Sequence, residues 1–288
     1  MERQVDVRSQ GIYSLQYVLL AATSMLFFGS MYFAMPVLPL YAVAIGADAS
    51  QVGLVLGAFT VTAVLCRLYA GSLCDRLGRK PALLAGILVY ILAPLAYLVT
   101  KTIPLLLLAR ALNGVGIALF SVASWAIVAD LVPPRRRREG MGIFGLAAVV
   151  SMAIVPPLAL PLLEIIGYDA LFVTASATAA ASLLLGLAVS DQGRDTAVRI
   201  TGPAAFSDVV RHGWLLSPSL ALAAGAVTFG AVLSYLPLFA AERGLGNAGL
   251  FYGVYAFATM ITRIPLGRLS DAIGPTRILV RHSSCWPA

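Results

Sequence analysis

Long apolar blocks separated by short polar stretches dominate the chain from residue 17 to residue 267. A helix needs about 20 mostly apolar residues to cross the roughly 30 Å hydrocarbon core of a bilayer, and each block has about that length. The pattern predicts eight spanning helices, over residues 17–41, 51–73, 82–100, 103–129, 141–163, 170–189, 217–240 and 249–267. We therefore expect an all-α membrane protein.

The composition supports this class and argues against several others. Hydrophobic residues make up 60% of the 288 and charged residues only 11%, whereas a soluble domain carries about 25% charge. The three cysteines and two histidines lack the spacing of a disulfide framework, a zinc site or a thiol active site. The spans also hold no clustered carboxylates, no histidine pair and no serine beside a base. We expect no metal, no cofactor and no enzymatic activity.

The basic residues divide unevenly between the two sets of loops. Only Lys101 and Arg243 lie in loops on one side, against fourteen on the other. These fourteen are Arg3, Arg8, Arg76, Arg79, Lys80, Arg135, Arg136, Arg137, Arg138, Arg194, Arg199, Arg211, Arg277 and Arg281. Because cytoplasmic loops carry the excess of Lys and Arg, we expect a multi-pass protein of the plasma (inner) membrane with a cytoplasmic N-terminus.

The run of four arginines at 135–138 has two interpretations. It follows Pro133 and Pro134 in a short loop, which favours a simple topology anchor. A lipid-binding or nucleic-acid-binding patch is the alternative. We expect the lipid bilayer as a partner and no nucleic acid.

A repeat links the second and eighth predicted helices at a constant offset of 196 residues. The matched pairs are Arg67 with Arg263, Gly71 with Gly267, Asp75 with Asp271, and Gly78 with Gly274. The longest polar connection divides six helices from two. The sequence thus predicts an N-terminal six-helix half at 1–190, a cytoplasmic linker at 191–216 and an incomplete C-terminal half at 217–288.

The second copy ends differently from the first. Residues 277–280 resemble the apolar start that follows Pro81 in the first copy, but residues 281–288 are a short polar tail. A frameshift or premature termination explains this better than an eight-helix design, so we expect a truncated chain.

Four segments resemble the major facilitator superfamily. Residues 71–80, GSLCDRLGRK, match its signature between helices two and three, and residues 267–274 match the degenerate second copy. Residues 110–116, RALNGVG, resemble a second signature found in proton-coupled members, with Asn113 where Gln is common. Residues 36–41, PVLPLY, are similar to the drug:proton antiporter branch, whereas residues 152–160 keep prolines but lack the glycines of the antiporter signature.

The resemblance implies a helical bundle of two six-helix halves, of which this chain holds the first and two helices of the second. It also implies that Gly71, Asp75, Arg76, Gly78, Arg79 and Lys80, with the repeat residues Arg263, Gly267, Asp271 and Gly274, form a conformational switch. Asp75 would act on a helix N-terminus in the other half, and Asp271 on the N-terminus of helix five near residues 139–141. The alternative is that Asp75 pairs with Arg76 or Arg79 in its own turn.

The clearest candidate for substrate binding or coupling is Arg110, with Asn113 and Gly114 in the same motif. Arg110 lies about 10 Å into helix four at 1.5 Å per residue, where an ionisable side chain is costly and indicates function. It could polarise a substrate, couple to a proton site, or extend back to the outer interface. Glu164 is the only acid expected near it, because no Asp or Glu lies mid-span.

These expectations describe a secondary carrier for a small, amphipathic solute, with proton-coupled drug or metabolite efflux as the most specific form. Because that mechanism needs both halves, we expect the 288-residue chain to be inactive alone. The alternative is a non-transporting membrane protein or a subunit that associates with another carrier.

Overall fold

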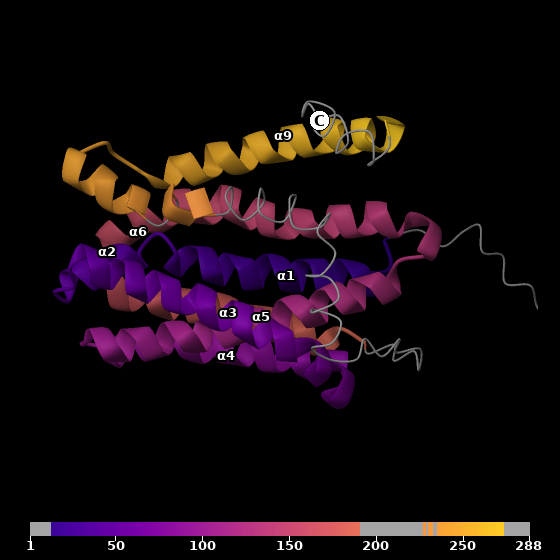
Figure 1. Cartoon of the computed structure of the whole chain (residues 1–288), viewed down its shortest axis with the longest axis horizontal. Coiled ribbons are helices and arrows are strands. Elements are labelled where there is room, and N and C mark those ends of the chain that lie inside the picture. The colour runs from indigo at the N-terminus through magenta and orange to yellow at the C-terminus, as the bar shows by residue number, and fades with distance from the viewer. Residues whose placement is uncertain (1–12, 191–226, 229, 233–234, 274–288) are drawn as a thin grey trace, which may run out of the picture.

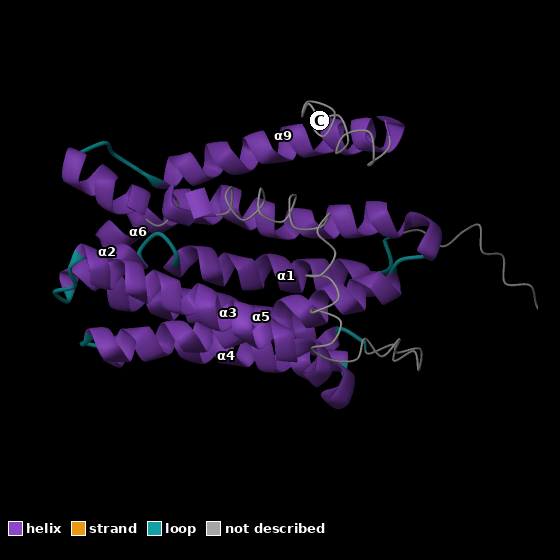
Figure 2. Ribbon diagram, in the orientation of Figure 1, coloured by secondary structure: helices purple, strands orange, loops and turns teal. Residues whose placement is uncertain are grey.

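The computed structural model describes residues 13–190, 227–228, 230–232 and 235–273, and the elements assigned there are helices that run side by side (Figures 1 and 2). They are α1 (Leu15–Ala34), α2 (Leu38–Ala44), α3 (Ala49–Leu77), α4 (Arg79–Val99), α5 (Ile103–Leu131), the 3-10 turn η1 (Pro134–Arg136), α6 (Arg137–Ala188) and α9 (Gly249–Ile273). The predicted all-α fold is confirmed for this part of the chain.

The helix ends follow from local sequence. Asp48 and Gln51 form a reciprocal capping box that begins α3, with the Asp48 carboxylate accepting from the Gln51 N–H at 2.8 Å. The first predicted span is divided into α1 and α2 by a turn, and Pro39 lies in the first turn of α2, where a missing N–H costs little. By length and composition, five described stretches could cross a membrane, and residues 139–188 are the longest.

The two predicted spans at 141–163 and 170–189 are one interrupted helix, α6, that folds back on itself. Gly167 has φ +75°, a conformation that favours glycine, and it separates a first arm (137–166) from a second arm (168–188). Ser151 and Ser182, on opposite arms, donate to carbonyls of α1 that are only two residues apart, at 2.7 and 2.8 Å. Both arms therefore pack against the same part of α1.

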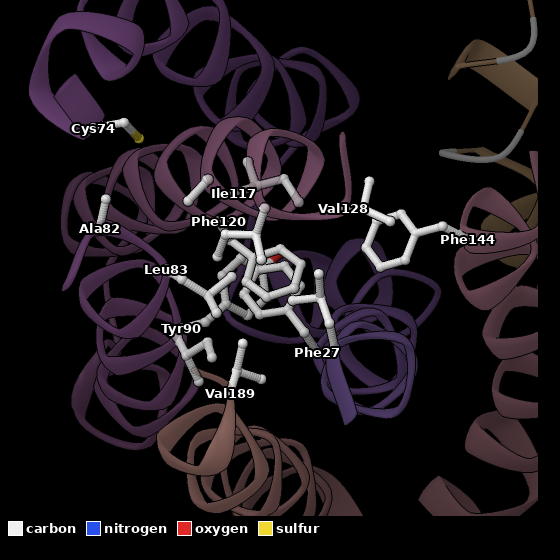
Figure 3. Packing of buried hydrophobic residues seen from close by; sticks show 14 of the residues in the cluster. Phe27, Cys74, Ala82, Leu83, Tyr90, Ile117, Phe120, Val128, Phe144 and Val189 are labelled. Carbon is white, nitrogen blue, oxygen red and sulfur yellow. The ribbon is translucent and has the colours of Figure 1, made fainter. Parts of the chain in front are cut away.

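The core is built from close helix crossings. α1 packs on α6, α5 packs on both α3 and α4, and α4 also contacts α6. Phe27 of α1 stacks on Phe120 of α5 with ring centroids 3.7 Å apart, and Tyr90 of α4 lies against the same pair (Figure 3). A Cβ at Gly86 would lie 2.6 Å from the Phe120 nitrogen, so α4 and α5 touch through their backbones.

A second unit, made of the described helical residues 227–243 and α9, lies along the first arm of α6 (Figure 1). Pro161 has no N–H, so the Pro157 carbonyl of α6 lacks its helical donor. Asn247, just before α9, fills this role, because its Nδ2 donates to the Pro157 oxygen at 2.8 Å. Its Oδ1 accepts from the Gly249 N–H at 2.8 Å, which also orders the start of α9.

We predict that Asn247→Ala lowers the free energy of unfolding by about 1 kcal/mol, because the Pro157 carbonyl loses its donor. Reversible unfolding in mixed micelles measures the change. Thr259→Ala is the matched control, since the Thr259 hydroxyl donates only within α9, to the Tyr255 carbonyl at 2.8 Å. Pro161→Ala restores a backbone N–H and should reduce the cost of Asn247→Ala. An undiminished cost in that background would contradict the prediction.

Candidate functional site

The first group of predicted site residues lies where α3 passes into α4, which we call the Arg79 end of the bundle. Gly78 makes the turn with φ +92°, and its N–H closes α3 on the Cys74 carbonyl at 3.0 Å. α4 begins at the next residue, Arg79. A single glycine therefore joins the two helices and directs the side chains of Arg79 and Lys80 onto neighbouring helices.

Arg79 and Lys80 tie α4 to two other helices. Arg79 forms an ion pair with Asp130 near the end of α5 and also donates to the Ala126 carbonyl at 3.4 Å. Lys80 donates to the Leu187 carbonyl, on the second arm of α6, at 2.8 Å. Sequence reasoning missed Asp130. The available signal was its position as the last acidic residue before the basic loop, at the membrane side where α4 begins.

Asp75 and Arg76 are exposed at the end of α3, whereas Gly78, Arg79 and Lys80 are partly buried. Within the described residues no ion pair involves Asp75, and Arg79 pairs with Asp130 instead. A Cβ at Gly71 would meet nothing within 4 Å. No described residue therefore packs closely on Gly71, and a latch role for Asp75 stays a prediction.

The repeat residues lie at the far end of α9 or beyond it. Arg263, Gly267 and Asp271 belong to the α9 backbone, but their side chains are outside the described part of the chain, as is all of Gly274. At the helix start that Asp271 was expected to contact, Glu139 pairs with Arg136 at 3.0 Å. The latch through Asp271 stays a prediction.

The second group centres on Arg110, which is buried inside the bundle. Its side chain is 6% exposed and lines an internal cavity, so it does not extend to the outer interface. The guanidinium carbon lies 4.6 Å from the centre of the Phe59 ring of α3, a cation–π contact. Its Nε has no hydrogen-bond partner. Arg110 is thus a charged group whose hydrogen-bonding capacity is not fully used.

Asn113, one turn further along α5, is also buried, at 2% exposure. Its Nδ2 donates to the hydroxyl of Tyr97 on α4, while its Oδ1 has no partner. Tyr97 is fully buried, and its hydroxyl also hydrogen-bonds to the Arg110 side chain. Sequence reasoning missed Phe59 and Tyr97, whose only signal was an aromatic ring in an otherwise largely aliphatic span.

Gly114 permits the close approach of α3 and α5 beside this cluster. A Cβ there would lie 2.6 Å from the Phe59 carbonyl oxygen and 2.9 Å from the Ala63 nitrogen. Since both atoms belong to the backbone, neither can move away as a flexible side chain could. Gly114 therefore fixes the distance between the helix that carries Arg110 and the helix that carries Phe59.

The cavity at Arg110 has a volume of about 140 Å³ and is lined by Met31, Met35, Leu56, Phe59, Thr60, Arg110 and Gly230. Gly230 comes from the second unit. Glu164, which was expected near Arg110, instead lines a separate cavity of about 660 Å³ between α6 and residues 237–248. That expectation is wrong, because Glu164 lies near the Gly167 end of the first arm and does not line the cavity that holds Arg110. The Arg110 cavity combines a cation with apolar walls.

Comparison with known proteins settles the family. Residues 20–285 match the family described as Major Facilitator Superfamily. The chain belongs to this superfamily. The staphylopine export protein of Staphylococcus aureus is 24% identical over 272 residues, which cover 92% of this chain and 68% of that protein. The multidrug resistance protein MdtL of Shewanella oneidensis is 27% identical over 201 residues, which cover 69% of this chain and 50% of that protein.

Solved structures of the superfamily share the fold. A bacterial homologue of the human lysosomal transporter Spinster, in an inward-facing and unoccupied conformation, superposes with a TM-score of 0.70 at 17% identity, covering 93% of this chain and 64% of that one. A D-xylose–proton symporter superposes with a TM-score of 0.56 at 17% identity, covering 89% and 68%. At this identity the likeness concerns the fold alone.

Membership in the major facilitator superfamily confirms the predicted fold class and a multi-pass membrane protein. Members are in general transporters rather than enzymes, in agreement with the expectation from the sequence. This chain spans about half to two-thirds of the length of the relatives and structures named above. The substrate of this chain and its transport mechanism are therefore proposals.

Proposed function

We propose that the chain carries the solute site of a secondary carrier for a small, amphipathic solute. The observation that carries this proposal is the buried Arg110, which lines a cavity closed by Gly230 of the second unit. A charge inside the membrane is costly, and major facilitator carriers bind solute between their two halves. Asn113 supplies a second polar group, and Gly114 holds the helices close enough to form the site.

Rocking of the two units against each other would open and close this site. The units are the proposed N-terminal half at 1–190 and the partial C-terminal half at 217–288, with a linker at 191–216. Two further cavities, of about 340 and 660 Å³, lie between them and mark a loosely filled boundary. The motif residues at the Arg79 end would fix α4 to α5 during this motion, with exposed Asp75 as the contact to the other half.

Export is the direction favoured by the names of the relatives, which include export, multidrug resistance and quinolone resistance proteins.

Coupling of transport to protons is also proposed. It is based on the sequence motif at Arg110 rather than on a carboxylate in the membrane interior. We further propose the plasma membrane, with a cytoplasmic N-terminus, because the basic residues concentrate in one set of loops. The alternative function is a non-transporting subunit that associates with another carrier.

Reconstitution of the 288-residue chain in proteoliposomes tests the proposal. The probes are mandelate, phenethylamine and phenylalanine, which are anionic, cationic and zwitterionic and small enough for the Arg110 cavity, and both saturable binding and counterflow are measured. We expect saturable binding of at least one probe without counterflow, because alternating access needs two complete halves. Internal pyranine reports any proton movement that accompanies flux.

Each outcome decides between the two functions. Counterflow above that of empty liposomes supports a carrier and makes the expectation of inactivity wrong. Binding without counterflow supports the proposed solute site in a partial carrier. Absence of both binding and counterflow for all three probes favours the non-transporting alternative.

A further inference from the structure

The charge of Arg110 is not balanced by any acidic side chain in the described part of the chain. The ion pairs found there join Arg79 to Asp130 and Arg136 to Glu139, and neither involves Arg110. Glu164, on the first arm of α6, lines a different cavity. A buried cation without a counter-charge is strongly unfavourable unless something supplies one.

The neighbours of Arg110 satisfy it only in part. The Phe59 ring takes one face of the guanidinium and the Tyr97 hydroxyl hydrogen-bonds to its edge, which leaves only part of the N–H donors for a ligand. The Nε donor is buried and has no partner. An arginine presents these donors as a planar fork that fits the two oxygens of a carboxylate or phosphate. The missing partner therefore has the chemistry of an oxyanion.

The apolar walls of the cavity indicate what the rest of that ligand is. Met31 of α1, Met35 in the turn just after it and Leu56 of α3 line it, together with Phe59. Methionine side chains adapt to ligands of different shape and contact aromatic rings favourably. These walls suit a compact apolar group rather than a hydrated one. A volume of about 140 Å³ limits the ligand to a small molecule.

We propose that this cavity binds a small anionic solute, with one carboxylate or phosphate held by Arg110 and an apolar body held by the two methionines and Phe59. The proposal rests on the carrier function above and names its substrate class. It assigns Arg110 to recognition of solute charge. The site thereby favours anions over cations of the same shape.

Three probes of matched shape test the charge preference: benzoate, neutral benzamide and cationic benzylamine. Binding to the 288-residue chain in phosphatidylcholine nanodiscs is measured by calorimetry. We expect benzoate to bind about 10- to 100-fold more tightly than benzylamine, the range expected for a hydrogen bond to a charged group. Arg110→Met should remove this preference, and Arg110→Lys should retain part of it, because lysine keeps the charge but loses the fork.

Arg243 offers a matched control. Its guanidinium carbon also lies over an aromatic ring, 5.4 Å from the centre of Phe239, but the residue is exposed. Arg243→Gln should leave benzoate affinity unchanged within about twofold. The unfolding midpoint of every variant shows whether it is folded, and Arg110→Lys provides the comparison if Arg110→Met fails to fold.

Results that overturn the proposal are distinct from those that overturn the carrier function. If benzamide or benzylamine binds as tightly as benzoate, or Arg110→Met retains the preference, the anion assignment is wrong while a solute site remains. If none of the three binds, the anion assignment is also wrong, and the counterflow experiment decides the carrier function independently.

A last experiment repeats the benzoate titration in nanodiscs that contain the anionic lipid phosphatidylglycerol. Competition with benzoate there would assign the site to a lipid headgroup and overturn a soluble anion.

Discussion

Gly114→Ala is expected to lower the free energy of unfolding by about 1–3 kcal/mol, the usual cost of overpacking a close contact. The new Cβ would lie 2.6 Å from the Phe59 carbonyl oxygen and 2.9 Å from the Ala63 nitrogen. Relief requires α3 to move away from α5, and this movement would also displace the Phe59 ring from Arg110. The free energy is measured by reversible unfolding in mixed micelles, and benzoate affinity is measured on the same preparation.

Gly142→Ala is the matched control for that substitution. Gly142 lies in the first arm of α6, where a Cβ would meet nothing within 4 Å. The change should leave stability unaltered or raise it by up to about 1 kcal/mol, because alanine favours helix. Equal effects of the two substitutions would contradict a close α3–α5 crossing at Gly114. A loss of stability without loss of benzoate affinity would separate packing from solute binding.

The helices could be predicted from the sequence because the membrane imposes one simple requirement. Each crossing needs a long apolar segment with all backbone groups paired internally, and such segments are visible as blocks. The turn at Gly167 lies in the six-residue interval expected between two spans, at 164–169. The division of the first span between α1 and α2 was not predicted, because both segments are apolar and only Pro36 in the turn and Pro39 in the first turn of α2 mark the break.

The site could be predicted only as far as it is local. Arg110, Asn113 and Gly114 belong to one turn of one helix, so their proximity follows from helix geometry. Their partners Phe59 and Tyr97 lie on α3 and α4, and hydrophobicity does not fix the rotation of one apolar helix against another. In a soluble helix the polar face shows the orientation, but a spanning helix is apolar on nearly all sides.

The same reasoning explains the error at Glu164. The sequence placed it with Arg110 because no Asp or Glu lies in the middle of a predicted span. Glu164 is instead exposed beside the 660 Å³ cavity, where water can solvate it. A similar depth in the membrane was therefore not enough to predict a contact between Glu164 and Arg110. Two side chains at the same depth meet only if their helices face each other in the bundle.

The ion pair between Arg79 and Asp130 is expected to show a coupling energy of about 1–3 kcal/mol in a double-mutant cycle with Arg79→Ala and Asp130→Ala. Both side chains are about three-quarters shielded from solvent, with exposures of 27% and 28%. Each single substitution leaves the other, largely shielded charge without its partner, which costs more than the loss of an exposed pair. The free energy of unfolding of the four proteins gives the coupling.

Arg136 and Glu139 form the comparison pair, because they too are an arginine and a carboxylate. Their nitrogen–oxygen distance is 3.0 Å, and their side chains are 47% and 52% exposed. Their coupling should be about 0.5 kcal/mol or less, and added salt should reduce it, whereas the shielded pair should resist salt. Equal coupling energies for the two pairs would mean that the Arg79–Asp130 ion pair stabilises the fold no more than an exposed surface pair does. A larger, salt-resistant coupling would mean that they hold α4 to α5 as one rigid body. That rigidity is what a rocking half needs if movement at the Arg79 end is to reach the Arg110 cavity, because both helices extend from that end to the solute site.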